Sequence, residues 1–311
     1  MITIWIIVFI VALAALVFAS DYFVDSSEEI GLGMGISSFV VGMTLVAVGT
    51  SLPELAASIV AVIKDSSELV VANVVGSNVA NIFLVLAVSA IVGKKILVNN
   101  NVLQNDLPIF IGSGLILAVM VWDLHFGLFD AIICLLGLVF YVTYLVKNDS
   151  VEVEDVEGEK PKISGKAIAI FVISIVAIPT AAYFTIDSVE RIGSYFGIAN
   201  EVFGLTVIAL GTSLPELFVG IAAVRKKKYD IAIGNVLGSN VFNAFAVMGI
   251  PALAGDLVIP ASIKAFALPL MVIGAFMFFF IIQDKKISKW EGMLLLLFYI
   301  FYIGQIIRTN I

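Results

Sequence analysis

The chain has 311 residues, of which 61% are hydrophobic and only 13% are charged, and its formal net charge is -7. A soluble domain carries about 25% charged residues, so a soluble enzyme is excluded and a bilayer must surround most of the chain. The acidic balance argues against nucleic acid as a partner. The single cysteine (Cys134) excludes a disulfide framework, and the single histidine (His125) argues against chemistry that needs several imidazoles.

Ten apolar segments are long enough to cross a bilayer, because a spanning helix takes about 20 residues. The second, third, seventh and eighth segments are interrupted by Gly, Pro, Ser, Thr and Asn, whereas the other six are plainer. The sequence therefore predicts an all-α polytopic membrane protein with ten transmembrane helices. These lie near residues 2–19, 36–63, 69–92, 107–122, 124–146, 166–186, 200–224, 229–254, 260–283 and 290–307.

The basic residues predict how these helices are oriented. With ten helices, both termini and four loops fall on one side with four Lys or Arg residues, while the other five loops carry thirteen. Basic loops stay in the cytoplasm, so we expect both termini outside. The first segment lacks the basic residues that precede a signal peptide, and we expect it to remain as a helix.

The second half of the chain repeats the first at a constant offset, which pairs Gly49 with Gly211. GTSLPEL occurs at 49–55 and again at 211–217, and GSNV-x-N occurs at 76–81 and again at 238–243. The alignment around these motifs, 42–85 with 204–247, needs no gap.

Each half contains five predicted helices, so the second half enters the membrane from the opposite side. Inverted repeats with paired broken helices are typical of secondary transporters. We expect a first five-helix repeat at 1–147, an acidic cytoplasmic linker at 148–162 and a second five-helix repeat at 163–311.

Of the 24 acidic residues, only Glu54 and Glu216 lie deep within apolar segments. An ionised carboxylate in mid-membrane is costly unless it is paired or faces water, and no Lys or Arg lies at matching depth. One interpretation is that two protonated carboxyls simply hold helices together. Their equivalent places in the two repeats favour a mobile cation as the partner.

Each glutamate follows a proline, Pro53 or Pro215. Proline lacks the N–H that would bond the carbonyl four residues earlier, so it bends the helix and frees oxygens near Gly49 and Gly211. A simple kink is the plainer interpretation, but unpaired backbone in a membrane is tolerated where it lines a cavity. Neighbouring hydroxyls raise the local density of oxygen, at Thr50, Ser51, Thr212 and Ser213.

The second motif adds a hydroxyl and an amide to each half. Their spacing of four places them on one helix face, and we expect the preceding glycine, like the prolines, to interrupt the helix and admit a neighbour. Small polar residues at helix contacts also serve packing alone. The residues are Gly76, Ser77 and Asn81 in the first half and Gly238, Ser239 and Asn243 in the second.

Together these residues offer carboxylate, hydroxyl, amide and carbonyl oxygens, without sulfur or imidazole. Such ligands suit Ca²⁺ or Na⁺ rather than zinc or copper. Two negative charges neutralise one Ca²⁺, or two Na⁺ with a third Na⁺ on neutral oxygens. One site could hold either load but not both, which is what exchange requires. No cofactor is expected beyond the transported ions.

At these motifs the sequence resembles the sodium/calcium exchanger family of the calcium/cation antiporters, whose two repeats carry GTSLPE followed by a GSN-type motif. The resemblance covers essentially the whole chain. It implies that Glu54 and Glu216 are the central ligands of Ca²⁺ and Na⁺, and that the first and sixth helices slide across the rest to switch access. It also implies ligation by Ser77, Ser239, Asn81, oxygens of Thr50 and Thr212, and backbone carbonyls of Ala47 and Ala209.

One departure concerns Asn243, because many relatives carry Asp at this position. Here both halves carry Asn, so a titratable group is lost and proton coupling through that position is not expected. Potassium-dependent relatives also use an acidic residue there, which argues against potassium co-transport. The large regulatory domains of animal relatives are absent, so we expect a prokaryotic plasma membrane as the location.

We predict electrogenic exchange of three Na⁺ for one Ca²⁺, by analogy with the family, with Ca²⁺ extruded and no enzymatic activity. An alternative is an H⁺/Ca²⁺ exchanger of the same superfamily, but such relatives usually carry a GN-x-x-E motif instead. A cation channel is a further alternative, although channels usually repeat by rotation around a pore. The expected partners are membrane lipid, Ca²⁺ and Na⁺, and a monomer is compatible with the sequence.

Overall fold

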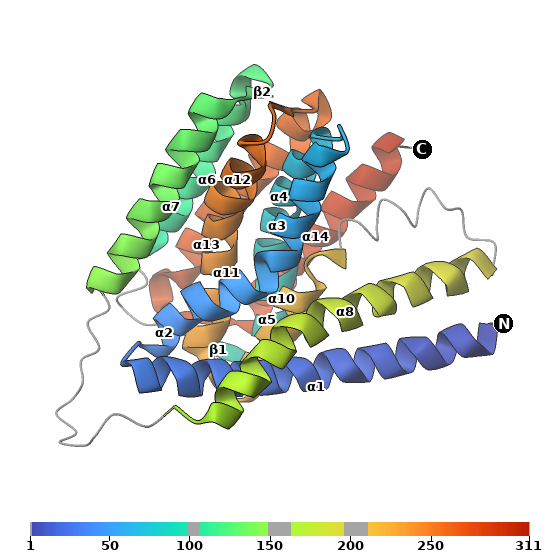
Figure 1. Ribbon diagram of the computed structural model, residues 1–311, viewed down its shortest axis with the longest axis vertical. Coiled ribbons are helices and arrows are strands. Elements are labelled where there is room, and N and C mark those ends of the chain that lie inside the picture. Colours follow the sequence, from blue (N-terminus) through green and yellow to red (C-terminus); the bar gives the residue numbers. More distant parts are fainter. Residues whose placement is uncertain (1, 99–105, 149–162, 196–210, 311) are drawn as a thin grey trace.

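The computed structural model describes residues 2–98, 106–148, 163–195 and 211–310, and helices dominate it (Figure 1). Within this described part, eight helices are long and apolar enough to cross a membrane. They are Ile2–Met34, Ser38–Ile63, Glu68–Gly93, Leu128–Lys147, Gly165–Tyr195, Tyr229–Ala252, Ile263–Asp284 and Lys289–Arg308. The protein is thus an integral membrane protein. The shorter apolar helix Leu107–Asp123 overlaps the segment predicted at 107–122. The helix Leu214–Arg225 overlaps the end of the segment predicted at 200–224, of which residues 200–210 lie outside the described residues.

Several spans contain more than one element. The first half comprises α1 (Ile2–Met34), α2 (Ser38–Val41), η1 (Gly42–Val46), α3 (Ala47–Ile63), α4 (Glu68–Ala80), η2 (Asn81–Val85), α5 (Leu86–Gly93), β1 (Lys95–Leu97), α6 (Leu107–Met120), η4 (Val121–Asp123), β2 (His125–Phe126) and α7 (Leu128–Asn148). The second half comprises α8 (Gly165–Tyr195), α10 (Leu214–Arg225), α11 (Tyr229–Phe242), η5 (Asn243–Val247), α12 (Met248–Ala252), β3 (Leu257–Val258), η6 (Ile263–Ala267), α13 (Leu268–Ile281), η7 (Ile282–Asp284), β4 (Lys286–Ser288) and α14 (Lys289–Asn310).

Wide π-helical turns begin at both motif asparagines. η2 starts at Asn81 and η5 starts at Asn243, and both elements are five residues long. The two starting residues are equivalent positions of the sequence repeat. Such π-helical turns inside α-helices frequently mark functional sites.

The first helix is longer than its apolar segment predicts. We expect a span near 2–19, whereas α1 continues to Met34. The added turns carry Asp25 and Glu28, which form ion pairs with Lys226 and Lys228 from the other half of the chain. Hydropathy misses this extension because distant lysines stabilise the charged end of the helix.

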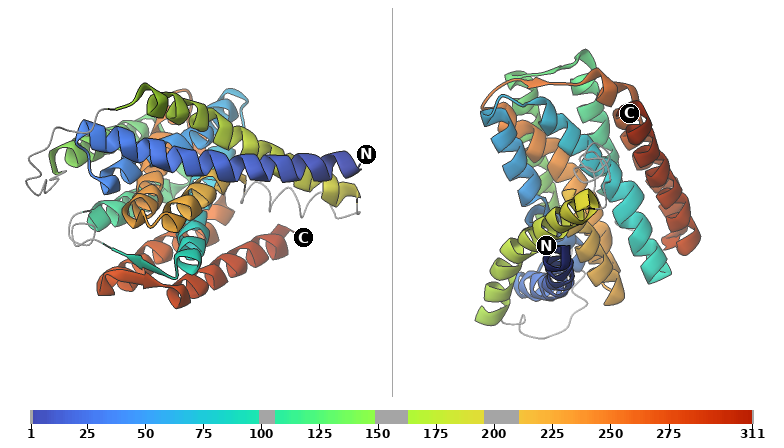
Figure 2. Two further views of the ribbon diagram at one scale, coloured as in Figure 1. Left: turned by 90° about the horizontal axis from the view of Figure 1, so that it is seen from below. Right: turned by 90° about the vertical axis from the view of Figure 1, so that its right-hand side faces the viewer.

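Helices α1 and α8 lie side by side, and in Figure 1 they run across the steeper helices of the rest of the molecule. The views in Figure 2 show the same pairing. At the centre lies α11, in which every residue from Ile231 to Phe242 is buried. The outer helices instead expose large apolar side chains such as Phe129 and Leu297, as a lipid environment requires.

Two short antiparallel sheets depart from the all-α expectation. β1 pairs with β4, with Lys95 opposite Ser288, and β2 pairs with β3, with His125 opposite Val258. Each sheet joins a strand from the first half of the chain to one from the second. Strand pairs of two or three residues leave no periodicity that a sequence reading could detect.

The glycines of the second motif do not interrupt their helices, contrary to expectation. Gly76 lies inside α4 and Gly238 lies inside α11. Gly238 admits a close crossing, because a Cβ there would lie 2.5 Å from the carbonyl oxygen of Met43. At Gly76 the nearest contact of such a Cβ is the Tyr302 hydroxyl, at 3.7 Å. The two equivalent glycines therefore face different constraints.

This difference predicts opposite effects of alanine at the two positions. Gly238→Ala should lower the free energy of unfolding by about 1–3 kcal/mol, because backbone must move to accept the methyl group. Gly76→Ala should be neutral or stabilise by up to about 1 kcal/mol, because alanine favours helix over glycine. Denaturant unfolding of the purified proteins in detergent, followed by circular dichroism, measures both. Equal effects of the two substitutions would contradict the asymmetric crossing.

Candidate cation-binding site

The two intramembrane glutamates lie deep in the protein, Glu54 on α3 and Glu216 on α10, and each is 1% exposed. Both carboxylate oxygens of Glu54 and the Oε2 of Glu216 lack a hydrogen-bond partner among the described residues. None of the ion pairs formed by the described residues involves either glutamate. A buried carboxylate without a partner is strongly destabilising, so the site is suited to a cation.

The helix that carries Glu54 also contacts Glu216. Ser51 Oγ donates a hydrogen bond to Glu216 Oε1 at 3.2 Å. Ser51 and Glu54 are three residues apart in α3 and therefore share a face of that helix. The two carboxylates consequently belong to one site, although they come from opposite halves of the sequence.

Hydroxyls and amides from both halves surround this pair. Ser77 Oγ and Thr212 Oγ1 share a hydrogen bond of 3.1 Å. Asn243 Nδ2 donates to Asn78 Oδ1 at 3.2 Å, which leaves Asn243 Oδ1 free to accept. Each of these bonds joins a first-half residue to a second-half residue, so the site is assembled where the two halves meet.

Several predicted ligands have buried oxygens to offer. These oxygens lie below the surface and have no hydrogen-bond partner in the part of the chain that the structure describes. They are Ser213 Oγ, Ser239 Oγ, Asn81 Oδ1 and Asn243 Oδ1. With the carboxylates they form a set of oxygens of the kind that binds Ca²⁺ or Na⁺.

The residues at the start of the first motif lie differently in the two halves. Thr50 Oγ1 lies 3.2 Å from the Ala47 carbonyl, within hydrogen-bond reach. Ala209, the equivalent of Ala47, lies outside the described residues. Pro53 lies inside the continuous helix α3, whereas Pro215 lies in the first turn of α10. Of the two prolines expected to interrupt a helix, only Pro215 therefore stands at a helix end.

Two asparagines complete the site and are missed by the sequence reasoning. Asn73 Nδ2 donates to the Glu54 carbonyl at 3.3 Å, and Asn235 Nδ2 donates to the Glu216 carbonyl at 3.4 Å. The two asparagines are equivalent in the repeat, and each lies one helical turn before the motif serine. The signal in the sequence that could have identified them is an asparagine that recurs in both repeats, on the same helix face as the motif serine.

The α1–α8 pair covers the start of each GTSLPEL motif. A Cβ on Gly49 would lie 2.8 Å from Phe23 of α1, and a Cβ on Gly211 would lie 2.7 Å from Ile186 of α8. Glycine at these two positions therefore lets an apolar side chain approach the helix immediately before the site threonines. The two long helices are thus in contact with the backbone that leads into the site.

Buried carboxylates and neutral oxygens, assembled between crossing membrane helices, define a class of protein: polytopic membrane proteins with a buried polar site between their helices. A family model described as sodium/calcium exchanger protein matches residues 4–147 and 166–307. The chain therefore belongs to the sodium/calcium exchanger family, as its motifs predict.

Individual relatives agree with this assignment. The chain is 32% identical to sodium/calcium exchanger MaX1 of Methanosarcina acetivorans, covering 97% of this chain and 98% of that protein. It is 34% identical to inner membrane protein YrbG of Escherichia coli, covering 78% of each. The solved structure of the sodium-calcium exchanger NCX_Mj soaked with 10 mM Na⁺ matches with a TM-score of 0.86 at 30% identity, covering 98% of this chain and 99% of that one.

Proposed function

We propose that this protein exchanges Na⁺ for Ca²⁺ across the membrane, with three Na⁺ moved against one Ca²⁺. The observation that carries the proposal is the pair Glu54 and Glu216, buried without a compensating charge among the described residues. A transported cation supplies that charge. The family and the printed names of its members support sodium and calcium as the two substrates.

The charge of the site explains why the two ions exclude one another. Two ionised carboxylates neutralise one Ca²⁺, whose shell of about 6–8 oxygens the neighbouring hydroxyls and amides can complete. The same carboxylates neutralise two Na⁺, and a third Na⁺ binds on neutral oxygens such as those of Thr50 and Ala47. Both loads need Glu54 and Glu216, so the site holds one load at a time.

The proposed ligands around Glu54 and Glu216 are hydroxyl, amide and backbone carbonyl oxygens. The hydroxyls and amides face each other across the junction of the two halves, and the backbone carbonyls lie before the threonines. The full proposed set is Glu54, Glu216, Thr50, Thr212, Ser51, Ser213, Ser77, Ser239, Asn81, Asn243, Ala47 and Ala209.

Access to the site alternates through the arrangement of the helices. We assign five helices to each of two inverted repeats, 1–147 and 163–311, joined by a cytoplasmic linker at 148–162. Recurrence of elements at equivalent positions, such as η2 with η5, supports the repeat. The paired helices α1 and α8 are the elements that slide across the rest. The distribution of basic residues supports an orientation with both termini outside, and the membrane we propose is a prokaryotic plasma membrane.

The energetics allow Ca²⁺ to be extruded. A tenfold Na⁺ gradient supplies about 1.4 kcal/mol per ion, so three Na⁺ supply about 4 kcal/mol. One net positive charge moving inward across 100 mV adds about 2.3 kcal/mol. The sum of about 6.5 kcal/mol sustains a Ca²⁺ ratio of order 10⁴ to 10⁵.

Asn243 argues against coupling of the exchange to H⁺ or to K⁺. An amide carries no charge at any physiological pH, so this position neither binds nor releases a proton during transport. It also adds no third negative charge to hold an additional monovalent cation. Exchange should therefore run without a pH gradient and without K⁺.

Proteoliposomes loaded with Na⁺ test the proposal. When external Na⁺ is low they should accumulate Ca²⁺, and Glu54→Gln should reduce this uptake at least about a hundredfold, because one charge of the buried site is removed. Glu68→Gln is the matched control, since Glu68 is exposed at the start of α4 and should leave uptake unchanged. Uptake is measured with Na⁺, K⁺ and pH gradients imposed separately.

Two outcomes would overturn the assignment. Uptake driven by a pH gradient without Na⁺ would show an H⁺/Ca²⁺ exchanger instead. Undiminished uptake by the Glu54→Gln protein would show that the ion does not bind at this pair.

A further inference from the structure

One fully buried side chain of α11, Asn235, lies between the two halves of the site. Its Nδ2 donates to the Glu216 carbonyl at 3.4 Å, and its Oδ1 accepts from Thr50 Oγ1 at 3.3 Å. A carbonyl oxygen can only accept, so Nδ2 faces Glu216 and Oδ1 must face Thr50. Asn235 therefore links the backbone of the second-half glutamate to a first-half hydroxyl.

The direction of the Thr50 proton decides what this hydroxyl can bind. A threonine hydroxyl has one proton and two lone pairs, and it holds a cation only through a lone pair. Asn235 Oδ1 and the Ala47 carbonyl both lie within reach of this proton, and the Glu216 carboxylate is a third group that interacts with the Thr50 hydroxyl. When Asn235 accepts it, the lone pairs of Thr50 and the Ala47 carbonyl are both left for an ion.

We propose that Asn235 is a positioning residue for sodium. It holds the Thr50 proton and so turns the Thr50 oxygen, together with the Ala47 carbonyl, toward a bound Na⁺. This inference rests on the proposed function, in which Thr50 is a Na⁺ ligand. Sodium is the ion affected more, because in the proposed function the third Na⁺ binds on these two neutral oxygens, whereas the charge of Ca²⁺ is met by the carboxylates.

The equivalent residue of the first half has a different environment. Asn73 Nδ2 donates to Ser58 Oγ at 3.2 Å as well as to the Glu54 carbonyl. The position equivalent to Ser58 in the second half is Gly220, which has no hydroxyl. Asn73 is therefore a matched control with the same carbonyl contact and a different second partner.

A double-mutant cycle tests the proposal through inhibition of Ca²⁺ uptake by external Na⁺ in proteoliposomes. Asn235→Ala should raise the half-inhibiting Na⁺ concentration about five- to tenfold, the loss expected from one hydrogen bond. The half-saturating Ca²⁺ concentration should change less than twofold. In a Thr50→Val background, Asn235→Ala should have no further effect on Na⁺, because the hydroxyl it orients is already gone.

The control and the remaining outcomes separate the possibilities. Asn73→Ala should add its effect in full to that of Thr50→Val, since Asn73 contacts Glu54 and Ser58 of α3 and not the Thr50 hydroxyl. Additive effects of Asn235→Ala and Thr50→Val would overturn the proposal.

If Thr50→Val alone leaves Na⁺ inhibition unchanged, Thr50 is not a ligand and that part of the proposed function fails. Asn235→Ser, which keeps a polar side chain, replaces Asn235→Ala if the latter does not fold, with the same expectation.

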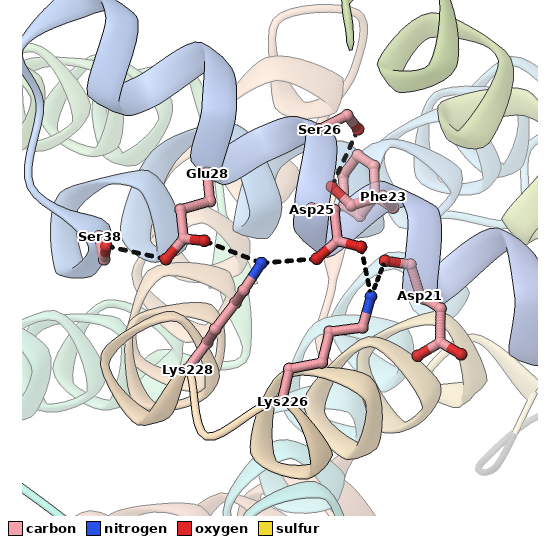
Figure 3. Close-up of polar contacts among 8 residues, drawn as sticks. All are labelled: Asp21, Phe23, Asp25, Ser26, Glu28, Ser38, Lys226 and Lys228. Carbon is pink, nitrogen blue, oxygen red and sulfur yellow. Dashed lines mark hydrogen bonds and ion pairs between the residues drawn. The ribbon is translucent and has the colours of Figure 1, made fainter. Parts of the chain in front are cut away.

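A separate cluster of charges fastens α1 to the loop between α10 and α11 (Figure 3). Asp25 accepts hydrogen bonds from Lys226 Nζ and Lys228 Nζ, each at 2.6 Å, and Lys228 Nζ also pairs with Glu28 at 2.8 Å. Lys226 Nζ further donates to the backbone carbonyl of Asp21 at 2.6 Å. Four contacts thereby join the charged end of α1 to one short loop.

This loop connects the two helices that carry second-half site residues. α10 carries Glu216 and α11 carries Asn235, so movement of α1 past the loop must break the ion pairs. Lys228 is the better shielded of the two lysines, with its side chain 18% exposed. Burial lowers the pKa of Lys228, but hydrogen bonds and attraction from Asp25 and Glu28 outweigh it, so this pKa is raised and the lysine stays charged.

Among the residues that the structure describes, the ion pairs recorded at the two equivalent places differ. Asp187 is the repeat partner of Asp25, and it pairs with Arg191 four residues along the same helix, at 2.9 Å. An ion pair within one helix does not resist sliding of that helix. The cluster around Asp25 therefore acts on one side of the membrane.

We infer that this cluster is a one-sided ionic latch, formed by Asp25 and Glu28 of α1 with Lys226 and Lys228 of the α10–α11 loop. It holds the sliding pair α1 and α8 against the loop and closes the site on that side. The latch must open before the site opens there. It rests on the proposed alternating access, but not on which ions are exchanged.

A buried cysteine reporter tests the latch. Ala222 is 3% exposed and lies one turn before Lys226, on the same face of α10. In a Cys134→Ala background, Ala222→Cys should react slowly with a membrane-impermeant maleimide added on the Lys226 side. Asp25→Lys with Glu28→Lys should speed this labelling about tenfold or more, because like charges now repel across the loop.

Charge exchange makes the result specific. Adding Lys226→Asp and Lys228→Glu to the two α1 reversals restores opposite charges and should restore slow labelling. Asp187→Asn, at the equivalent place in α8, should leave labelling slow.

Labelling that is unchanged by the α1 reversals, or not slowed by the full exchange, would overturn the latch. Lys226→Gln with Lys228→Gln, which should speed labelling, serves if the reversals prevent folding. Labelling does not depend on ion selectivity, so a failed latch is distinguishable from a failed exchanger assignment.

Discussion

The central constraint on this structure is the cost of holding two carboxylates inside a membrane. Glu54 and Glu216 are buried in a region without a basic partner among the described residues, and in the proposed function a cation that arrives from water meets their charge. A permanent lysine or arginine would stabilise the protein but would prevent transport. Retaining the charge unpaired makes ion binding favourable and makes an empty, fully ionised site unfavourable. The proposed alternation between two loads follows from this requirement.

The rest of the molecule keeps the pair together and surrounds it with oxygen atoms. Ser51 joins the two glutamate-bearing helices, and Asn78 holds the Asn243 amide so that its oxygen stays free. Gly238 brings α11 against the backbone at Met43, which places the two halves in direct contact. These contacts all join one half to the other, so both halves hold the site residues in place.

Hydropathy and the internal repeat predict most of the arrangement. The segment predicted at 36–63 is the helix Ser38–Ile63. Hydrogen bonds between the two halves involve the motif residues Ser51, Ser77, Thr212 and Asn243. What hydropathy cannot predict depends on partners that are distant in sequence. The charged extension of α1 forms because Lys226 and Lys228 come from the other half, and the roles of Asn73 and Asn235 depend on carbonyls of neighbouring helices. A glycine motif likewise does not reveal that only Gly238 is tightly packed.

If one set of carboxylates serves both ions, Na⁺ and Ca²⁺ must compete at equilibrium, and a binding measurement tests this directly. Radioactive Ca²⁺ bound to the purified protein in detergent should be displaced fully by Na⁺, with a Hill coefficient above about two if several Na⁺ bind together. Ca²⁺ binding that persists at saturating Na⁺ would contradict a shared site.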